Sequence, residues 1–450
     1  MTGWRRSLTV LALCTAAGAS SSLVAGCGSL PGEQGGSRDT VTVMTWAPES
    51  TRATNMPGMP AMAAAYARWV NARGGIDGHR LRVLTCNDHN DLIGAGNCAE
   101  RAVKEGVVAV VGSYSLYGQS FMPPLEAAGI PYIGGYGVSS EEFRSALSYP
   151  VNGGQASLLA GSGRQLARDC DRVALVRPET VDGDELPNLL DTGLGEGGRG
   201  PAEDIPTTED ASEYGAQAAE ALRAVGTGAG TPGALSSGSG TTDGGTTGSG
   251  TGTGCVSAVL GDRTQTFVDS FRRQEGSGPP EGPGRQVRIA SVLGSVGQGL
   301  VDSTGGKDGP YEGAYITGWY PVAGDPRWQP MRDVIDKYAF NDNRVDPADA
   351  GVETTWIAYT ALKEVIESLG KDHVTADDLT GALDGGLAVR TGGLTPTLRW
   401  RFQDMLASRD FPRLVNHRVT CQVVRGGRLV ALRKGAVDVG PTLEKASLSE

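Results

Sequence analysis

Cysteine is the residue whose positions in this chain most directly suggest chemistry. The chain has 450 residues and seven cysteines. One of them, Cys27, stands where the apolar stretch "SLVAG" gives way to the Gly/Ser-rich stretch "GSLPGEQGGSRDT". A thiol in a protein can form a disulfide, bind zinc or carry a lipid. The residues around each cysteine therefore indicate which of these reactions it undergoes.

The segment before Cys27 has the layout of an export signal. It carries Arg5 and Arg6, no acidic residue, and then the apolar run "LTVLALC". A positive start followed by a short apolar run is typical of a secretory signal peptide. The run is also too short to span a bilayer comfortably. We therefore expect residues 1–26 to be a signal peptide, and twin-arginine export stays open as an alternative route.

The motif "LVAGC" at 23–27 resembles the lipobox of bacterial lipoproteins. The resemblance implies that Cys27 receives a diacylglyceryl group and becomes the first residue of the mature chain. Two acyl chains anchor a protein stably where one does not. We expect residues 27–39 to be a flexible tether that holds the globular part at the outer face of the cell membrane. An ordinary signal followed by a chance cysteine is the alternative.

Overall charge narrows the choice of partners. The formal net charge is −11, and the predicted signal contributes two of the arginines. An acidic chain gains nothing from a phosphate backbone, so we expect no nucleic-acid partner. No stretch after the signal is long and apolar enough to span a membrane. The remainder is long enough for two or three compact domains.

Apolar strands and amphipathic helices alternate along the chain. Strands are predicted at 41–46, 81–86 and 107–112, and the pattern restarts with "RVALVRP", "CVSAVLGD" and "RQVRIASVLG". This alternation predicts an α/β protein with two Rossmann-like lobes and parallel sheets. The predicted domains are lobe 1 at 40–150 plus 320–395, lobe 2 at 151–319 plus 396–440, a disordered Gly/Ser/Thr insert in lobe 2 at 226–254, and a tail at 441–450.

Several motifs between residues 61 and 136 resemble one family jointly. They are the helix ending in "NARGGI", the turn "DHND" after a strand, the buried strand "VVAVVG" and the stretch "LEAAGIP". Together they resemble type I extracellular solute-binding proteins of the leucine/isoleucine/valine-binding kind. The resemblance implies two lobes joined by a hinge that the chain crosses several times. It also implies a receptor that captures a small polar solute, such as an amino acid, and delivers it to the permease of an ABC importer.

The loops at the carboxyl ends of the predicted strands are the candidate ligand-binding loops, because these ends face a common crevice. The candidate residues are Ser113, Tyr114, Ser115, Tyr117, Tyr136, Gly137, Val138, Ser139, Asp182, Asp262, Arg263 and Ser295. In the family, a hydroxyl and amides of the first loop hold the polar head of the ligand, and either Ser115 or Leu116 falls at that hydroxyl. Val138 stands where the family commonly has a threonine that binds an α-amino acid. Helix capping, packing or simple solvation are the alternative roles of these residues.

Metal binding and catalysis are not predicted. The cluster Asp88, His89, Asn90 and Asp91 lacks the glycine and the distant glutamate of a calcium loop, so a strand-to-helix turn is the expected role. The chain contains no G-x-S-x-G elbow, P-loop or HExxH motif. We expect a monomer with no cofactor. The rival hypotheses are a ligand-sensing or protein-interaction lipoprotein without a transporter, and a cell-envelope enzyme.

The five remaining cysteines can oxidise outside the cytoplasm. Cys86 ends a predicted strand and Cys98 lies in the helix that follows, so a bridge between them is expected. Cys170 and Cys255 each precede a strand of the second lobe, and parallel neighbours would bring them within reach of each other. Cys421 would then be a free thiol, although it could compete for either second-lobe partner. No CxxC or HxxxH spacing indicates zinc.

Overall fold

The computed structural model describes residues 38–208, 210–226, 253–277 and 287–446. The predicted signal, Cys27, nearly all of the tether, most of the 226–254 insert and the end of the tail lie outside these residues. In the part of the chain that is described, no helix has the length and apolarity needed to cross a membrane.

The first lobe is built on a five-stranded sheet of order β2-β1-β3-β4-β5, in which all neighbours are parallel. Its strands are β1 (Arg38–Trp46), β2 (His79–Cys86), β3 (Ala109–Val111), β4 (Tyr132–Ile133) and β5 (Ser148–Tyr149). Side chains alternate along β1: Val41 and Val43 join the core on one face, and Met44 and Trp46 join the core on the other. The sheet is therefore buried on both faces, as parallel sheets require.

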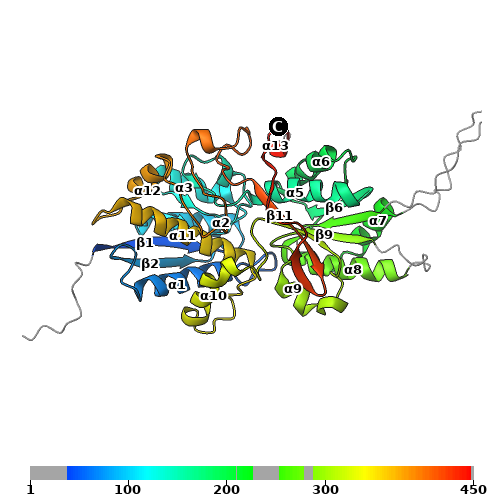
Figure 1. Ribbon diagram of the computed structural model, residues 1–450, viewed down its shortest axis with the longest axis horizontal. Coiled ribbons are helices and arrows are strands. Elements are labelled where there is room, and N and C mark those ends of the chain that lie inside the picture. The colour runs from blue at the N-terminus through cyan, green and yellow to red at the C-terminus, as the bar shows by residue number, and fades with distance from the viewer. Residues whose placement is uncertain (1–37, 209, 227–252, 278–286, 447–450) are drawn as a thin grey trace, which may run out of the picture. The chain divides into compact units, whose positions relative to one another are not determined.

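Helices cover both faces of this first sheet. They are α1 (Gly58–Asn71), α2 (Leu92–Lys104), α3 (Gly118–Ala128), α4 (Glu141–Arg144), α10 (Gln329–Tyr338), α11 (Ala350–Leu369) and α12 (Ala376–Asp384). Helices α1, α10 and α11 pack together, and α2 packs on α3 (Figure 1). The ends of helix α11 are fixed by two residues: Asp349 caps its first turn, and Gly370 ends it in the left-handed conformation, with φ 58°.

The second lobe is built on a mixed sheet of order β12-β11-β10-β9-β8-β6-β7, with β13 paired to β11. The strands are β6 (Arg172–Pro178), β7 (Glu203–Thr207), β8 (Gly254–Ala258), β9 (Arg288–Val292), β10 (Tyr315–Gly318), β11 (Arg418–Arg425), β12 (Arg428–Ala431) and β13 (Val437–Asp438). Strands β6 to β10 are parallel to one another, whereas β11 is antiparallel to β10 and β12. The predicted terminal hairpin is confirmed, with its turn at Gly426 and Gly427.

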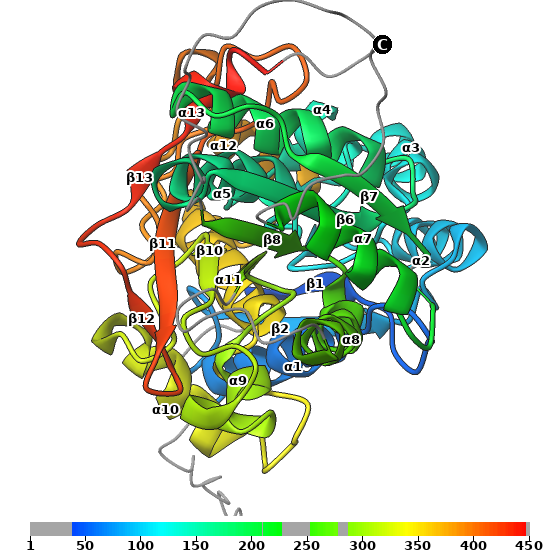
Figure 2. The same ribbon diagram turned by 90° about the vertical axis from the view of Figure 1, so that its right-hand side faces the viewer.

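Two groups of helices flank the second sheet. They are α5 (Gly154–Asp169), α6 (Leu186–Glu196), α7 (Gly215–Val225), α8 (Thr264–Ser277), α9 (Gln298–Ser303) and α13 (Gly440–Leu443). Helices α5, α6 and α13 form one group, and α7 and α8 lie on the other side of β6 and β8 (Figure 2). Both lobes are therefore three-layered, and the predicted α/β fold with two lobes is confirmed.

The described chain passes between the lobes after β5, after β10 and before β11. The last passage is long. Residues 400–413, which the sequence analysis assigned to lobe 2, contact the first lobe: Trp400 donates a hydrogen bond to the Pro150 carbonyl at 3.2 Å, and Phe411 packs edge-on against Phe143. The assignment to the second lobe therefore applies only from β11 onward, because Trp400 and Phe411 are buried and pack on aromatic rings of β5 and α4.

Both predicted disulfides are present, and each lies within one lobe. Cys86 of β2 is joined to Cys98 of α2, and Cys170 is joined to Cys255 at the start of β8. The parallel pairing of β6 with β8 brings the second pair together, with Val173 opposite Cys255. Cys421 is a buried free thiol on β11. Neither bridge crosses between the lobes, so neither restricts movement of one lobe against the other.

Candidate functional site

One cavity lies between the carboxyl ends of strands from both sheets, and we call it the cleft. The space between its lining residues, with open solvent counted in, amounts to about 670 Å³. The first lobe contributes the loops after β1, β3 and β4, and the second lobe contributes the loops after β6, β8, β9 and β10 together with the start of α5. This is the position that strand topology favours for a ligand in an α/β protein.

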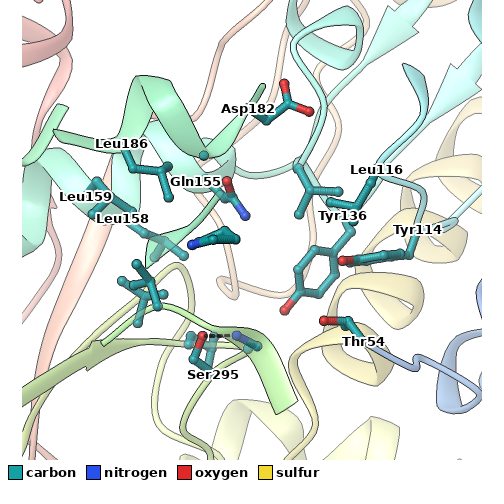
Figure 3. A pocket seen from close by; sticks show the side chains of 18 of the residues that line it. Thr54, Tyr114, Leu116, Tyr136, Gln155, Leu158, Leu159, Asp182, Leu186 and Ser295 are labelled. Carbon is teal, nitrogen blue, oxygen red and sulfur yellow. Dashed lines mark hydrogen bonds between the residues drawn. The ribbon is translucent and has the colours of Figure 1, made fainter. Parts of the chain in front are cut away.

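The lining of the cleft is mostly apolar. Leu158, Leu159 and Leu186 lie on one side, and Leu116 and Tyr114 lie on the other (Figure 3). The remaining apolar or aromatic lining residues are Met56, Tyr136, Val138, Pro178, Val259, Val292, Leu293 and Trp319. The polar side chains are those of Thr54, Gln155, Thr180, Asp182 and Ser295. Among the described lining residues there is no lysine, arginine, histidine or cysteine.

Tyr136 links the two lobes at the cleft. Its ring meets Trp319 edge-on at 5.1 Å between ring centres and lies 5.2 Å from the ring of Tyr114. Its hydroxyl lies close to Gly294, where an added Cβ would stand 2.1 Å from the oxygen. That hydroxyl is buried and has no hydrogen-bond partner in the described part of the chain. Burial, and secondarily the nearby Asp349 carboxylate, raise the pKa of Tyr136, so the phenol stays protonated and can donate a hydrogen bond.

Asp182 is the one charged side chain among the described residues of the lining. It follows β6 and lies at the rim, with its carboxylate turned away from the centre of the cleft (Figure 3). Burial, and secondarily the neighbouring Glu141 and Glu185 carboxylates, raise the pKa of Asp182 to about 7, while a hydrogen bond from the Ser140 N–H opposes this shift. Near neutral pH this side chain is therefore close to its midpoint of ionisation.

The loop after β4 directs its amides away from the cleft. The buried carboxylate of Glu142 accepts hydrogen bonds from the backbone N–H groups of Gly137, Val138 and Ser139, at 3.0, 3.0 and 3.2 Å. Burial raises the pKa of Glu142 to about 7, while these donors oppose the shift. The loop thus binds a carboxylate that belongs to the protein itself.

Five of the twelve predicted ligand-binding residues line the cleft: Tyr114, Tyr136, Val138, Asp182 and Ser295. They come from both lobes, as the strand-end argument predicted. The Ser295 hydroxyl accepts a hydrogen bond from the Gly261 N–H at 3.2 Å, so it also fixes the loop after β8. Their contact with a ligand stays a prediction.

Three predicted residues of the loop after β3 lie elsewhere. The Ser113 hydroxyl accepts a hydrogen bond from the Trp46 N–H at 3.0 Å inside the lobe. The Ser115 hydroxyl accepts one from the Tyr117 N–H at 3.3 Å and hydrogen-bonds to Asp88. Tyr117 precedes α3 and packs on the core beneath β1. Leu116, the alternative to Ser115 for the position of the family's hydroxyl, does line the cleft.

The other four predicted residues lie beside the cleft. Gly137 and Ser139 line a small adjoining cavity, which Asp182 also borders. Asp262 and Arg263 join the lobes: the Asp262 carboxylate accepts from the Asn55 N–H at 3.1 Å, and the Arg263 guanidinium donates to the Arg52 carbonyl at 2.7 Å. Both contacts hold the loop after β1 against the loop after β8.

Most of the lining residues were not among the candidates named from the sequence. Thr54 and Met56 follow β1, and Trp319 follows β10, so the strand-end argument would have found them if it had been applied to those strands. Gln155, Leu158 and Leu159 lie on the first turns of α5, directly after a passage between the lobes. No local pattern marks them, because their exposure to the cleft depends on how the lobes meet.

The Asp88 cluster is a turn, as expected. Asp91 caps α2 by accepting from the Gly94 N–H at 2.7 Å, and His89 and Asn90 adopt positive φ angles. Within the described ranges, no group of three or more potential ligands could hold a metal ion.

Comparison with known proteins agrees with this architecture. Residues 49–405 match the model of the periplasmic binding protein family. No curated protein sequence matches the chain.

Solved structures share the fold at low sequence identity. A possible leucine/isoleucine/valine-binding protein from Rhodopirellula baltica aligns with a TM-score of 0.67 at 13% identity, covering 88% of this chain and 97% of that one. An ABC transporter solute-binding protein from R. palustris in complex with 4-hydroxybenzoate gives 0.66 at 12%, covering 89% and 97%. A fatty acid ABC transporter substrate-binding protein from Thermomonospora curvata gives 0.64 at 13%, covering 91% and 95%.

The family match extends over most of the chain and includes every residue that lines the cleft. Only the last strands of the second sheet, from β11 on, lie beyond it. The fold agrees with it. The chain therefore belongs to the periplasmic binding protein family.

Proposed function

We propose that this protein is an extracytoplasmic receptor that captures a small organic solute between its two lobes and delivers it to an ABC importer. One observation carries the proposal: residues from the strand ends of both lobes line a single cavity. Three solved relatives of the same fold have names that describe solute binding or transport. We propose no catalytic activity, since the cavity is built for enclosure rather than for acid–base or nucleophilic chemistry.

Closure of the lobes is the signal that such a receptor gives its partner. Two contacts join the lobes next to the cleft, from the Asn55 N–H to Asp262 and from Arg263 to the Arg52 carbonyl. The passages between the lobes act as the hinge. A solute that bridges the loops after β4 and β9 would favour the state in which these contacts form.

Solute recovery tests the binding function. The full chain is purified gently, unfolded, and the released small molecules are identified by mass spectrometry. The recovered solute should then bind the refolded chain in a titration calorimeter. Spin labels can be attached to cysteines introduced by Ile93→Cys in the first lobe and Lys307→Cys in the second, since both positions are exposed. The solute should narrow the distribution of distances between the two labels. A protein that releases no solute and binds none from a broad metabolite collection would contradict the function.

Delivery to an importer is tested in the cell. Loss of this chain should abolish uptake of the recovered solute at low external concentration, and restoring the chain should recover it. Unchanged uptake would favour the rival hypothesis of a sensing or interaction lipoprotein. The lipid anchor at Cys27 is part of the same proposal, because a tethered receptor stays close to a membrane-embedded permease.

A further inference from the structure

The cleft lacks a cation for a negatively charged solute. Its described lining contains no lysine or arginine. Arg263 lies beside the cleft, and its guanidinium donates a hydrogen bond to the Arg52 carbonyl. An ionised carboxylate that leaves water needs a partner charge or several hydrogen bonds, since desolvation without them is strongly unfavourable. No lining side chain supplies that charge.

Backbone amides, which often bind anions at helix starts, are engaged within the protein here. In the second lobe, the Gly183 N–H donates to the Thr180 hydroxyl and the Gly261 N–H donates to Ser295. At the start of α5, the Gln155 N–H donates to the Gly137 carbonyl. In the first lobe, the Glu142 carboxylate accepts hydrogen bonds from the three backbone N–H groups of residues 137–139. These six backbone donors are therefore already satisfied within the protein.

The local electrostatic field also disfavours an anion. Asp182 lines the cleft, Asp262 borders it, and the carboxylates of Asp349 and Asp262 both act on the Tyr136 hydroxyl. Burial raises the pKa of Asp349 to about 6, so this carboxylate is largely ionised at neutral pH. A second negative charge brought between these groups would be repelled at short range.

The cleft nonetheless offers one strong polar contact. The Tyr136 side chain is 4% exposed, lies among the lining residues, and its hydroxyl has no hydrogen-bond partner among the residues that the structure describes. A buried hydroxyl without a partner costs about 1 to 3 kcal/mol, and a ligand that pairs with it recovers that energy. The Gln155 amide points into the space from the opposite side (Figure 3). Around these two groups the walls are leucine, valine and aromatic rings.

We propose that the cleft selects a largely apolar, non-anionic solute whose one polar group pairs with the Tyr136 hydroxyl, and that it rejects carboxylates, including zwitterionic amino acids. This inference rests on the proposed function and names its substrate class. It departs from the amino-acid ligand that the sequence resemblance implies. It differs for a physical reason: the Ser115 hydroxyl hydrogen-bonds to Asp88 inside the first lobe, and the amides of the loop after β4 bind the Glu142 carboxylate.

Matched pairs of probes test the head group while keeping the apolar body constant. The pairs are 4-hydroxybenzamide and 4-hydroxybenzoate, octanamide and octanoate, and 4-methylpentanamide and leucine. Affinities are measured with the full chain by titration calorimetry at pH 7.5. At least one amide should bind about 100-fold more tightly than its charged counterpart, because a charged head group would be desolvated without a partner.

Two tyrosine variants test the hydrogen bond. Tyr136→Phe should weaken amide binding about fivefold or more, since the ligand's polar group would lose its partner. Tyr311→Phe is the matched control: Tyr311 is another buried tyrosine whose hydroxyl has no partner, but it lies in the second-lobe core away from the cleft. It should leave binding unchanged. Both variants should fold, because each removes only an unpaired oxygen.

A third variant supplies the missing charge. Gln155→Lys places an ammonium group in the lining and should raise the affinity for 4-hydroxybenzoate about tenfold or more. The inference is overturned by carboxylates that bind as tightly as their amides, by equal effects of Tyr136→Phe and Tyr311→Phe, or by no binding within any pair. Recovery of a carboxylate from the purified protein overturns it while the receptor function stands. A protein that binds no solute at all contradicts the receptor function itself.

Discussion

The Asp182 carboxyl is held among like charges at the rim of the cleft. Its pKa is about 7 in the folded chain and 3.8 for an isolated side chain, because burial and the Glu141 and Glu185 carboxylates disfavour ionisation. Between these values the folded chain holds a proton that the unfolded chain has released. The free energy of unfolding therefore falls as pH rises through this window.

Asp182→Asn should remove this dependence. The neutral side chain should raise the melting temperature only slightly at pH 5, where the loss of stability has begun, and by several degrees at pH 8, where the loss is complete. Thermal unfolding across pH 5 to 8 measures the difference. The control is Asp377→Asn, at an exposed position on α12 that does not line the cleft. Parallel curves for wild type and Asp182→Asn would contradict the prediction.

Gly294 gives the Tyr136 hydroxyl its space. Its φ is 98°, and a Cβ there would stand 2.1 Å from the tyrosine oxygen. Gly294→Ala should lower the free energy of unfolding by about 2 kcal/mol or more, through backbone strain and this overlap.

A double-mutant cycle separates the two causes. In the Tyr136→Phe background the overlap with oxygen is gone, so the cost of Gly294→Ala should fall by about 1 kcal/mol while the backbone strain remains. Urea unfolding of the four proteins gives the coupling energy. Additive effects would show that the alanine methyl group is accommodated without moving Tyr136.

At the scale of elements, the two disulfides close loops of very different length. Cys86–Cys98 spans 12 residues of sequence and Cys170–Cys255 spans 85, whereas the Cα–Cα distance is 5.8 Å in both. A bridge that closes a longer loop removes more entropy from the unfolded chain.

Replacing both cysteines of a bridge by alanine should therefore cost more at Cys170–Cys255. The expected difference in the free energy of unfolding is about 1.5 to 2 kcal/mol in the chain-entropy account. Denaturant titration of the two double variants measures it, with Cys421→Ala as a control for loss of a thiol that forms no bridge. An equal loss, or a larger loss at Cys86–Cys98, would contradict the prediction.

Elements were predictable where one physical signal dominated. The short apolar run at 107–112 had to be a buried strand, and β3 occupies Ala109–Val111 within it. Residues 400–413 were misassigned because they lack any period, and their place is set by the contact of Trp400 with Pro150. Ser113 illustrates the same limit within a site. Its loop was predicted, but the direction of its hydroxyl depends on Trp46, far away in sequence.

At the scale of the whole molecule, export and anchoring rest on the first residues of the chain, which lie outside the described part. Cys27→Ser should abolish acylation, because the thiol is the atom that carries the lipid in the motif that this sequence resembles. The variant should accumulate as unprocessed precursor or be released from the membrane, as fractionation and mass spectrometry of the N-terminal peptide would show. Wild-type mobility in the membrane fraction would contradict the lipobox interpretation.

The two ends of the second-lobe insert meet. Val225 ends α7 and Gly254 begins β8, and a Cβ on Gly254 would lie 2.6 Å from the Val225 carbonyl oxygen. Ends that meet in this way accept a guest domain with little disturbance of the host. The site lies at the amino end of β8, whereas Val259 and Gly261 at its other end line the cleft. A circularly permuted fluorescent protein spliced at this point would be joined to the ligand through a single strand, which makes the chain a scaffold for an optical biosensor.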